Sequence, residues 1–281
     1  MLQVKIAGLT FCIEDRNQSS FKKLKLFESV FTEKPDIEIK FRFSGSFAEQ
    51  NYASLEYDGI SWNVQHAQEM IRASVFLKRT NRTEYMIETC HDWSDITIYY
   101  RKQAKRAEQA FCDFLGNFII SNKIIFHNGF VLHASSISHE GKGVVFTAPS
   151  RTGKSTHAAM WAKYYQASIL NDDCPIIKIE SGKSFIHGTP WSGAENKAMQ
   201  ASAPLSAIVI LEQASRNTIR ELNDKEAIPL LLPRVFLPYQ NPILMEAAMQ
   251  NVETAINSVP KYLLMCKADR EATELVYQCI K

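Results

Sequence analysis

The sequence lacks the features that mark several large classes of protein. No stretch approaches the roughly 18–20 apolar residues of a membrane-spanning helix, and the most apolar segment, AIPLLLPRVFLP, is broken by prolines and by Arg234. The first residues, MLQVKIAGLTFCIED, contain no apolar run of the kind found in secretory signals. These absences predict a cytoplasmic protein that makes no use of a membrane.

Cysteine is present without any paired pattern. The six cysteines form no CxxC pair, and neither they nor the seven histidines show the spacing of a zinc site. The cysteines are Cys12, Cys90, Cys112, Cys174, Cys266 and Cys279. We therefore expect buried free thiols in a reducing compartment.

The chain also has no large excess of positive or negative charge. The formal net charge is only +2, so the chain as a whole does not attract nucleic acid or a membrane surface. Arg72, Lys78, Arg79 and Arg82 lie near one another, but no aromatic side chains alternate with them as in a nucleic-acid site. We interpret them as a solvated strand face. The sequence has no internal repeat, and its 46% hydrophobic residues are typical of a globular protein.

Residues 1–101 are predicted to form a β-rich N-terminal domain. The segment IEIKFRF alternates apolar and charged residues, as a half-buried strand does. In NYASLEYDGISWNV, two short runs are joined by Asp58 and Gly59, which predicts a hairpin. RASVFLKR, TEYMIET and DITIYY continue the strand pattern.

The period changes after residue 101. In KQAKRAEQAFCDFLGNFII, apolar residues recur at steps of three and four, which predicts an amphipathic helix over about 102–121. We take residues 102–122 as the connection to a C-terminal domain over 123–281.

The C-terminal domain alternates predicted strands and helices. Strands are expected near Phe130–Ser138 and Val144–Thr147, followed by a helix from about Lys154 to Tyr164. A hairpin turning near Ser181, the strand SAIVILEQ, the helices KEAIPLLL and NPILMEAAMQNVETAINSV, the strand YLLMCKA and the helix DREATELVYQCI, capped by Asp269, complete the chain. This order predicts an α/β fold with a mainly parallel or mixed sheet.

The stretch APSRTGKST fits the phosphate-loop pattern A-x-x-x-x-G-K-S, with alanine in place of the first glycine. Such a loop, set between a strand and a helix, aims backbone N–H groups and the positive end of the helix dipole at a phosphate. Lys154 would reach the β- and γ-phosphates of ATP, and the Ser155 hydroxyl would bind Mg²⁺. The predicted nucleotide-binding residues are Ala148, Pro149, Ser150, Arg151, Thr152, Gly153, Lys154, Ser155 and Thr156.

Two further elements complete the candidate site. Asn171, Asp172 and Asp173 follow the short apolar run SIL, which is where such proteins hold the metal ion. One aspartate would bind Mg²⁺ and the other would face the acceptor, and the sequence does not say which does which. His133 precedes the loop on the neighbouring predicted strand, where it would face the phosphates.

Together, His133, the glycine-bearing hairpin, the phosphate loop and the Asp172–Asp173 pair resemble the catalytic domain of HPr kinase/phosphorylase, which shares its nucleotide fold with phosphoenolpyruvate carboxykinase. The resemblance covers roughly Phe130–Ile186. HGTPWSGAENK and the chain length resemble smaller HPr-kinase-like proteins, some of them associated with peptide-modifying gene sets. The resemblance implies a P-loop kinase core, ATP-dependent phosphorylation of a serine hydroxyl, catalytic roles for His133, Lys154, Asp172 and Asp173, and Mg²⁺ held by Ser155 and this aspartate pair.

The chain also departs from that family. Ala148 and Arg151 occupy positions that are glycine there, so Arg151 would be strained if its φ is positive. Residues Ser192–Pro204 contain no counterpart of the glycine-arginine loop that HPr kinases use for the reverse reaction. Neither HPr as the substrate nor phosphorylase activity is therefore implied.

The sequence thus predicts an ATP/Mg²⁺-dependent kinase that phosphorylates a serine of a peptide or protein. A small-molecule kinase, for example of free serine, and a non-catalytic ATP sensor are the alternatives. Trp191 in GTPWSG is either a packed turn residue or a platform at the acceptor site, with Glu195 or Lys197 at its rim. The N-terminal domain could act as a peptide clamp through exposed strand edges. The sequence leaves the acceptor, the oligomeric state (a homo-oligomer included) and any reverse activity open.

Overall fold

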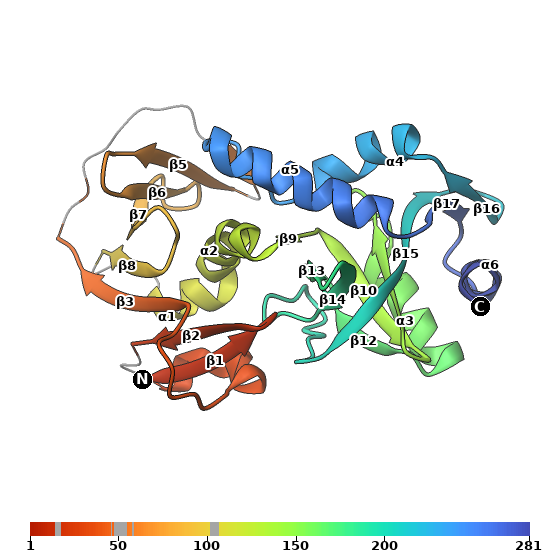
Figure 1. The fold of residues 1–281 in the computed structure, drawn as a ribbon, viewed down its shortest axis with the longest axis horizontal. Helices are drawn as coiled ribbons and strands as arrows, with labels where there is room; N and C mark the ends of the chain where they lie inside the picture. The colour runs from red at the N-terminus through yellow and green to blue at the C-terminus, as the bar shows by residue number, and fades with distance from the viewer. Residues whose placement is uncertain (15–17, 46, 48–54, 58, 102–106) are drawn as a thin grey trace. The chain divides into compact units, whose positions relative to one another are not determined.

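The computed structural model describes residues 1–14, 18–45, 47, 55–57, 59–101 and 107–281. The chain has mixed α/β structure with two sheets (Figure 1) and divides into two compact units, Met1–Ile119 and Ile120–Lys281. The N-terminal unit is β-rich, as the sequence predicts. No helix in the described ranges combines the length and the apolar character needed to cross a membrane.

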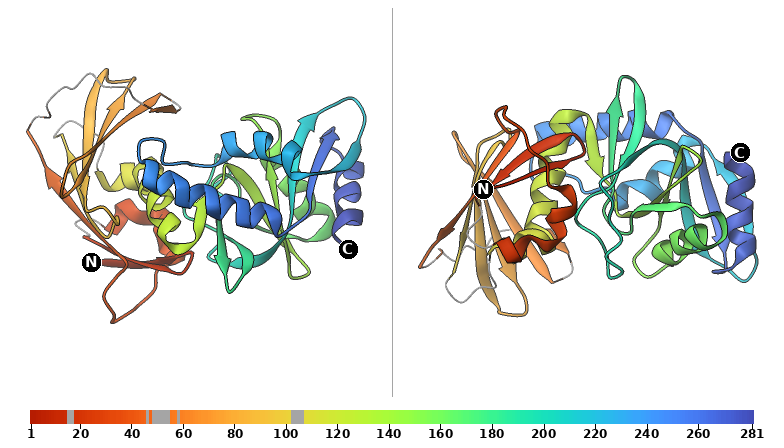
Figure 2. Two further views of the ribbon diagram at one scale, coloured as in Figure 1. Left: turned by 45° about the horizontal axis from the view of Figure 1, so that its top comes forward. Right: turned by 90° about the horizontal axis from the view of Figure 1, so that it is seen from below.

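The N-terminal unit contains an eight-stranded sheet in the order β1-β2-β3-β8-β7-β6-β5-β4. Its strands are drawn in red to orange in Figure 2. Its strands are β1 (Leu2–Ile6), β2 (Leu9–Ile13), β3 (Ile37–Phe43), β4 (Leu55–Tyr57), β5 (Ile60–His66), β6 (Ile71–Leu77), β7 (Arg82–Thr89) and β8 (Asp95–Tyr100). The predicted alternation is confirmed in β3, where Ile37, Ile39 and Phe41 are buried. Of the predicted hairpin turn, Asp58 lies outside the described residues.

The basic residues of this unit lie on an ion-paired surface. Arg72 pairs with Glu88 across β6 and β7 at 2.6 Å, and Arg82 pairs with Glu84 at 2.9 Å. The Arg72 side chain is half exposed. For Arg72 this arrangement agrees with a solvated strand face, whereas the partner of Arg82, Glu84, is buried.

Helical segments cover the N-terminal sheet, and here the sequence-based expectation needs correction. The 3-10 segment η1 (Gln18–Phe27) was not expected. The helix predicted over 102–121 is described only from residue 107, and it is irregular: α1 (Ala107–Ala110), the π-helical turn η2 (Phe111–Leu115), α2 (Gly116–Lys123) and the 3-10 turn η3 (Ile124–His127). The ring centroid of Trp62 lies 6.1 Å from that of Phe114 in the π turn and 4.1 Å from that of Phe118 in α2. Tertiary packing of large aromatics thus accompanies a departure from the regular helical period.

The C-terminal unit contains a nine-stranded mixed sheet, in which β12-β10-β11-β15-β14-β13-β9 are hydrogen-bonded neighbours in this order. In addition, β17 pairs with β15, and β16 pairs with β17. The strands are β9 (Gly129–Val131), β10 (Ala134–His139), β11 (Lys142–Thr147), β12 (Ser168–Asn171), β13 (Ile176–Glu180), β14 (Lys183–His187), β15 (Ser202–Gln213), β16 (Thr218–Leu222) and β17 (Lys261–Cys266). The helices are α3 (Lys154–Tyr165), α4 (Asp224–Leu231), the 3-10 turn η4 (Leu232–Arg234), α5 (Pro242–Asn257) and α6 (Arg270–Ile280).

One predicted strand of this unit is in fact two. The segment Phe130–Ser138 breaks after Val131, because β9 pairs with β13 whereas β10 pairs with β11 and β12. His133 lies in the break. The other predicted strands and helices are confirmed, including Asp269 as the N-cap of α6, which accepts a hydrogen bond from the Ala272 N–H.

Helices lie on both faces of the C-terminal sheet (Figure 1). Along β15, Ile208 and Ile210 belong to a core formed with α4 and α5. Val209 and Leu211 belong to a second core, formed with α3 and α6. This alternation explains the almost continuous apolar run SAIVILEQ, because a strand covered on both faces has no solvent side.

All six cysteines are free, as predicted. Only Cys112 and Cys174 are buried; the other four are partly exposed, so the expectation of buried thiols holds for these two alone.

Candidate functional site

The strand directions bring the three predicted elements to one edge of the C-terminal sheet. In the antiparallel pair β10–β11, Ala134 lies opposite Thr147, and in the antiparallel pair β10–β12, Ser136 lies opposite Asn171. The end of β11, the end of β12 and the start of β10 therefore share this edge. The 148–153 loop, the aspartate pair and His133 extend directly from those three positions.

The 148–153 loop joins β11 to α3 in the expected strand–loop–helix order. Gly153 has φ 110° and precedes the first helical residue, Lys154. Arg151 has φ 65°, so the strain anticipated from the sequence is present. The side-chain amide of Gln213, at the end of β15, donates to the Thr152 carbonyl at 3.3 Å. This hydrogen bond anchors the 148–153 loop to the end of β15.

Lys154 folds back over the loop that precedes it. Its Nζ donates to the carbonyl oxygens of Ala148 at 3.2 Å and Pro149 at 3.4 Å, and the residue is buried. Burial lowers the pKa of the Lys154 ammonium; the charge of Asp173 opposes this shift and that of Arg234 adds to it. Ser155 is half-buried in the first turn of α3 and Thr156 is exposed. The Lys154 ammonium is therefore a buried cation, held by two carbonyl oxygens in the loop.

The two aspartates differ sharply in environment. Asp172 is 5% exposed; its Oδ1 accepts from the Gly193 N–H at 2.7 Å, and its buried Oδ2 has no hydrogen-bond partner among the described residues. Burial raises the pKa of Asp172, against the hydrogen bonds from backbone N–H groups. The carboxyl of Asp172 is therefore held in surroundings that favour taking up a proton.

Asp173 instead contacts a histidine and a thiol. Its Oδ1 lies 3.3 Å from His133 Nε2, and its Oδ2 accepts from the Cys174 thiol at 3.4 Å. Burial acts to raise the pKa of Asp173, but His133, Cys174 and the charge of Lys154 together outweigh it, and the pKa is lowered. The Asp173 carboxylate therefore stays ionised and faces the Lys154 side of the site.

His133 lies in the break between β9 and β10, which fixes the position of its backbone. Its backbone N–H donates to the Arg234 carbonyl at 2.8 Å, and its carbonyl accepts from the Thr147 hydroxyl at 3.0 Å. These bonds anchor both sides of its peptide backbone while the ring reaches Asp173. All four predicted catalytic residues, His133, Lys154, Asp172 and Asp173, are thus brought together.

Arg234 is a residue that the sequence analysis missed. It ends the η4 turn, and the bridge between Leu132 and Val235 ties that turn to the β9–β10 break. In the described part of the chain, its buried Nε has no hydrogen-bond partner. The sequence signal available was an arginine inside an otherwise apolar segment, AIPLLLPRVFLP, which we had used only to exclude a membrane span.

The segment after β14 closes over Asp172. The Lys197 carbonyl accepts from the Asp172 N–H at 3.1 Å, and Gly193 binds the Asp172 carboxylate. Trp191 is 3% exposed, so it is the packed turn residue and not an exposed platform. Glu195 and Lys197 are exposed on the same segment.

The residues fit a divalent cation held jointly with phosphates. Within the described residues, no group of three or more His, Cys, Asp or Glu side chains is close enough to hold a metal ion alone. Mg²⁺ commonly binds through one or two carboxylates together with substrate phosphates, so a complete protein cage is not required. The ionised Asp173, next to the unpartnered Asp172 Oδ2, supplies suitable oxygen atoms.

Comparison with known proteins gives a family for this arrangement. Residues 117–276 match the family model described as SynChlorMet cassette protein ScmC. The chain belongs to the ScmC family. The match contains the whole candidate site and leaves out the N-terminal sheet. No curated protein sequence matches this ScmC-family chain.

Among solved structures, this ScmC-family chain is similar to the Hpr(Ser) kinase/phosphatase from Coxiella burnetii. The two are 16% identical with a TM-score of 0.32, and the similarity covers 53% of this chain and 89% of that chain.

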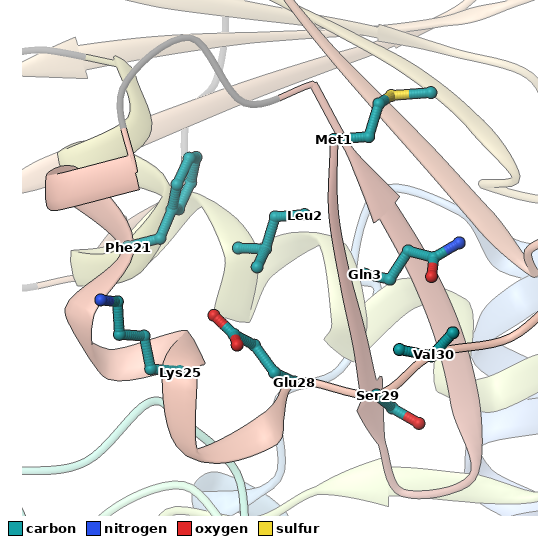
Figure 3. Close-up of a pocket in the computed structure, with 8 residues that line it drawn as sticks. All are labelled: Met1, Leu2, Gln3, Phe21, Lys25, Glu28, Ser29 and Val30. Carbon is teal, nitrogen blue, oxygen red and sulfur yellow. The ribbon is translucent and has the colours of Figure 1, made fainter.

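A separate cavity of about 370 Å³ lies in the N-terminal unit (Figure 3). It is bounded by the start of β1, by Phe21 and Lys25 of η1, and by the segment Glu28–Val30. None of its lining residues was predicted to take part in the chemistry. The peptide-clamp role of this unit stays a prediction.

Proposed function

We propose that the C-terminal unit binds ATP with Mg²⁺ and transfers the γ-phosphoryl group to a serine hydroxyl of a peptide or protein. The observation that carries this proposal is the meeting of Lys154, Asp172, Asp173 and His133 at the carboxyl end of β11. These groups are the ones that phosphoryl transfer needs: a cation, a metal ligand and a proton acceptor.

The 148–153 loop and the start of α3 are suited to the triphosphate. The first N–H groups of a helix have no partners within it, and they carry the positive end of the helix dipole. Lys154, released from the Ala148 and Pro149 carbonyls, would reach the β- and γ-phosphates. Arg234 would supply a second cation near Lys154.

The aspartates take different roles in this proposal. Asp173, with its lowered pKa, and Ser155 hold Mg²⁺, which neutralises charge on the phosphates when bound. Asp172, with its raised pKa, accepts the proton of the attacking serine hydroxyl. His133 orients the Asp173 carboxylate through the 3.3 Å contact and faces the phosphates. The choice of serine rests on the resemblance of these motifs to those of HPr kinase.

Label transfer from γ-phosphate-labelled ATP tests the proposal. Wild type and Lys154→Ala are each given lysate from the source cell, divided into peptide, protein and small-molecule fractions. We expect one peptide or protein product, formed about 100-fold more slowly by the variant because a charge that stabilises the transition state is lost. A product confined to the small-molecule fraction would point to a small-molecule kinase. ATP binding without any product would point to the sensor.

Arg234 gives a second test, in a pair of variants. Arg234→Gln is expected to lower the transfer rate about tenfold, whereas Arg234→Lys should recover part of the loss because it keeps the charge but not the planar fork. Both variants should melt close to wild type, since Arg234 Nε has no hydrogen-bond partner among the described residues and the Arg234 carbonyl, which binds His133, is kept. Steady-state rates and thermal melts of the three proteins decide the matter. Equal rates in all three would remove Arg234 from the site.

A further inference from the structure

The turn that carries the two aspartates is built around a fully buried asparagine, Asn171. Its Oδ1 accepts from the N–H groups of Asp173 at 2.8 Å and Cys174 at 2.7 Å. Its Nδ2 donates to the carbonyl oxygens of Thr189 at 2.8 Å and Trp191 at 3.2 Å. A side-chain amide has two N–H donors and one carbonyl oxygen with two lone pairs, so these four contacts match its capacity; the Thr189 hydroxyl is a third acceptor beside Nδ2 and shares one of the two N–H groups.

Thr189 closes this network from the other side. Its Oγ1 donates to the Cys174 carbonyl at 2.8 Å and lies 3.1 Å from the Asn171 Nδ2, which donates to it. Like Asn171, it is 0% exposed. Asn171 and Thr189 therefore join two chain segments, the acidic turn 171–174 and the covering segment 188–198.

Two contacts of Asp172 come from the same covering segment, besides the Ser135 hydroxyl of β10, which donates to the Asp172 carbonyl at 3.1 Å. Gly193 N–H binds its carboxylate, and the Lys197 carbonyl accepts from its backbone N–H. The Asp172 side chain extends from the acidic turn, and the Gly193 N–H that binds it belongs to the covering segment. Asn171 and Thr189 fix these two segments together. A shift between the two segments would move the Asp172 carboxylate away from Gly193.

We propose that Asn171 and Thr189 are positioning residues, which lock the acidic turn to the covering segment so that Asp172 and Asp173 keep their separate orientations. This inference rests on the proposed function for its catalytic consequence. Neither residue touches a reacting atom. Both act through the backbone and carboxylate of the aspartates, where an error of about 1 Å can cost about 100-fold in rate.

Three variants test the network with matched chemistry. Thr189→Val keeps the side-chain shape but removes the hydroxyl, and Thr189→Ser keeps the hydroxyl and is the control. Asn171→Asp keeps an oxygen for the N–H groups of Asp173 and Cys174, but it places a second oxygen against the carbonyls of Thr189 and Trp191. The acidic turn is retained in that variant while its link to the covering segment is lost.

The first measurement is amide hydrogen exchange of the ligand-free proteins, which requires no activity. In Thr189→Val and Asn171→Asp, exchange in segments 170–175 and 188–198 should be about tenfold faster than in wild type. Thr189→Ser should match wild type, and the rest of the C-terminal unit should be unchanged in all variants. Unchanged exchange in the two segments, or faster exchange throughout the unit, would overturn the proposed lock.

The second measurement separates kcat from KM in the transfer assay, at a temperature where every variant is folded. Thr189→Val and Asn171→Asp should lose about 100-fold in kcat, with the KM for ATP unchanged, and Thr189→Ser should retain its rate. Faster local exchange with an unchanged kcat would show that the network links the two segments without affecting catalysis, and would overturn the positioning role. A wild type that transfers no phosphoryl group would instead remove the proposed function, and with it the catalytic part of this inference, whereas the exchange result would still stand.

Discussion

Replacing Asp172 by asparagine is expected to slow phosphoryl transfer by about 1,000-fold while making the folded protein more stable. The catalytic loss follows from removing the proposed proton acceptor. ATP binding should change little, because Asp172 is the partner of Gly193 and the ionised Asp173 is the closer match to a metal ligand. Initial rates, together with direct nucleotide titration, measure the two effects separately.

The gain in stability follows from the direction of the Asp172 pKa shift. Burial raises this pKa above the ordinary value of 3.8, so the folded state disfavours the carboxylate. The resulting destabilisation is absent below pH 3.8, grows as the pH rises toward the folded pKa, and is complete only above the folded pKa. Asp172→Asn removes it and should melt a few degrees above wild type at pH 7, with the difference disappearing in acid.

The same substitution at the next residue should have the opposite effect on stability. The pKa of Asp173 is lowered, so its carboxylate stabilises the fold above pH 3.8 and that contribution is lost as the pH falls through the folded pKa. Asp173→Asn should therefore melt below wild type at neutral pH. The shift should be small, because the side chain is 39% exposed and solvent screens its contact with His133. In the transfer assay it should raise the Mg²⁺ concentration needed for half-maximal rate about tenfold or more.

Two neighbouring and chemically identical substitutions thus give opposite signs, which a general effect of surface charge would not. Thermal melts of both variants between pH 3 and pH 7 provide the comparison. Equal shifts of the same sign would contradict the assigned environments. An Asp172→Asn protein that retained a tenth of the wild-type rate would contradict the role of Asp172 as proton acceptor.

The sequence was most informative where chemistry and local structure coincide. The 148–153 loop, the aspartate pair and the flanking strand and helix are contiguous patterns, and each is found where it was expected. His133 could be placed near them because β10 and β11 form a hairpin, which is itself a local structure. The alternation of Ile37, Ile39 and Phe41 likewise allowed β3 to be predicted from the sequence alone.

What the sequence did not reveal depends on contacts between distant segments. The strand break at His133 exists because β9 and β10 pair with different partners, a choice made by the whole sheet. Arg234 reaches the site through pairing of its turn with the β9–β10 break, including the bridge between Leu132 and Val235, which spans about a hundred residues of sequence. Asn171 looked like an ordinary turn former, since its five contacts with residues of both segments appear only when Thr189 and Trp191 are in place.

Gly188 should be the position in the site region least tolerant of a side chain. A Cβ added there would lie 2.0 Å from the Met199 carbonyl oxygen and 2.6 Å from that of Leu170. Both obstacles are backbone atoms, and they cannot rotate away as the end of a side chain could. The Gly188 N–H also donates to the Ala201 carbonyl, and the Met199 N–H donates to the Leu170 carbonyl, so the crowded backbone segments are tied in place.

Gly188→Ala is therefore expected to destabilise the C-terminal unit by about 4 kcal/mol or more, a size reserved for severe changes in a packed interior. Gly193→Ala, in the same covering segment, is the control: its Cβ would meet its nearest neighbours at 3.4–3.6 Å, an ordinary contact. Denaturant unfolding of the two variants and wild type gives the free energies. A Gly188→Ala protein as stable as the Gly193→Ala control would show that the covering segment can move away from β12. Because Gly193 and Lys197 hold Asp172 from that same segment, such freedom would also contradict the fixed position from which Asp172 is proposed to act.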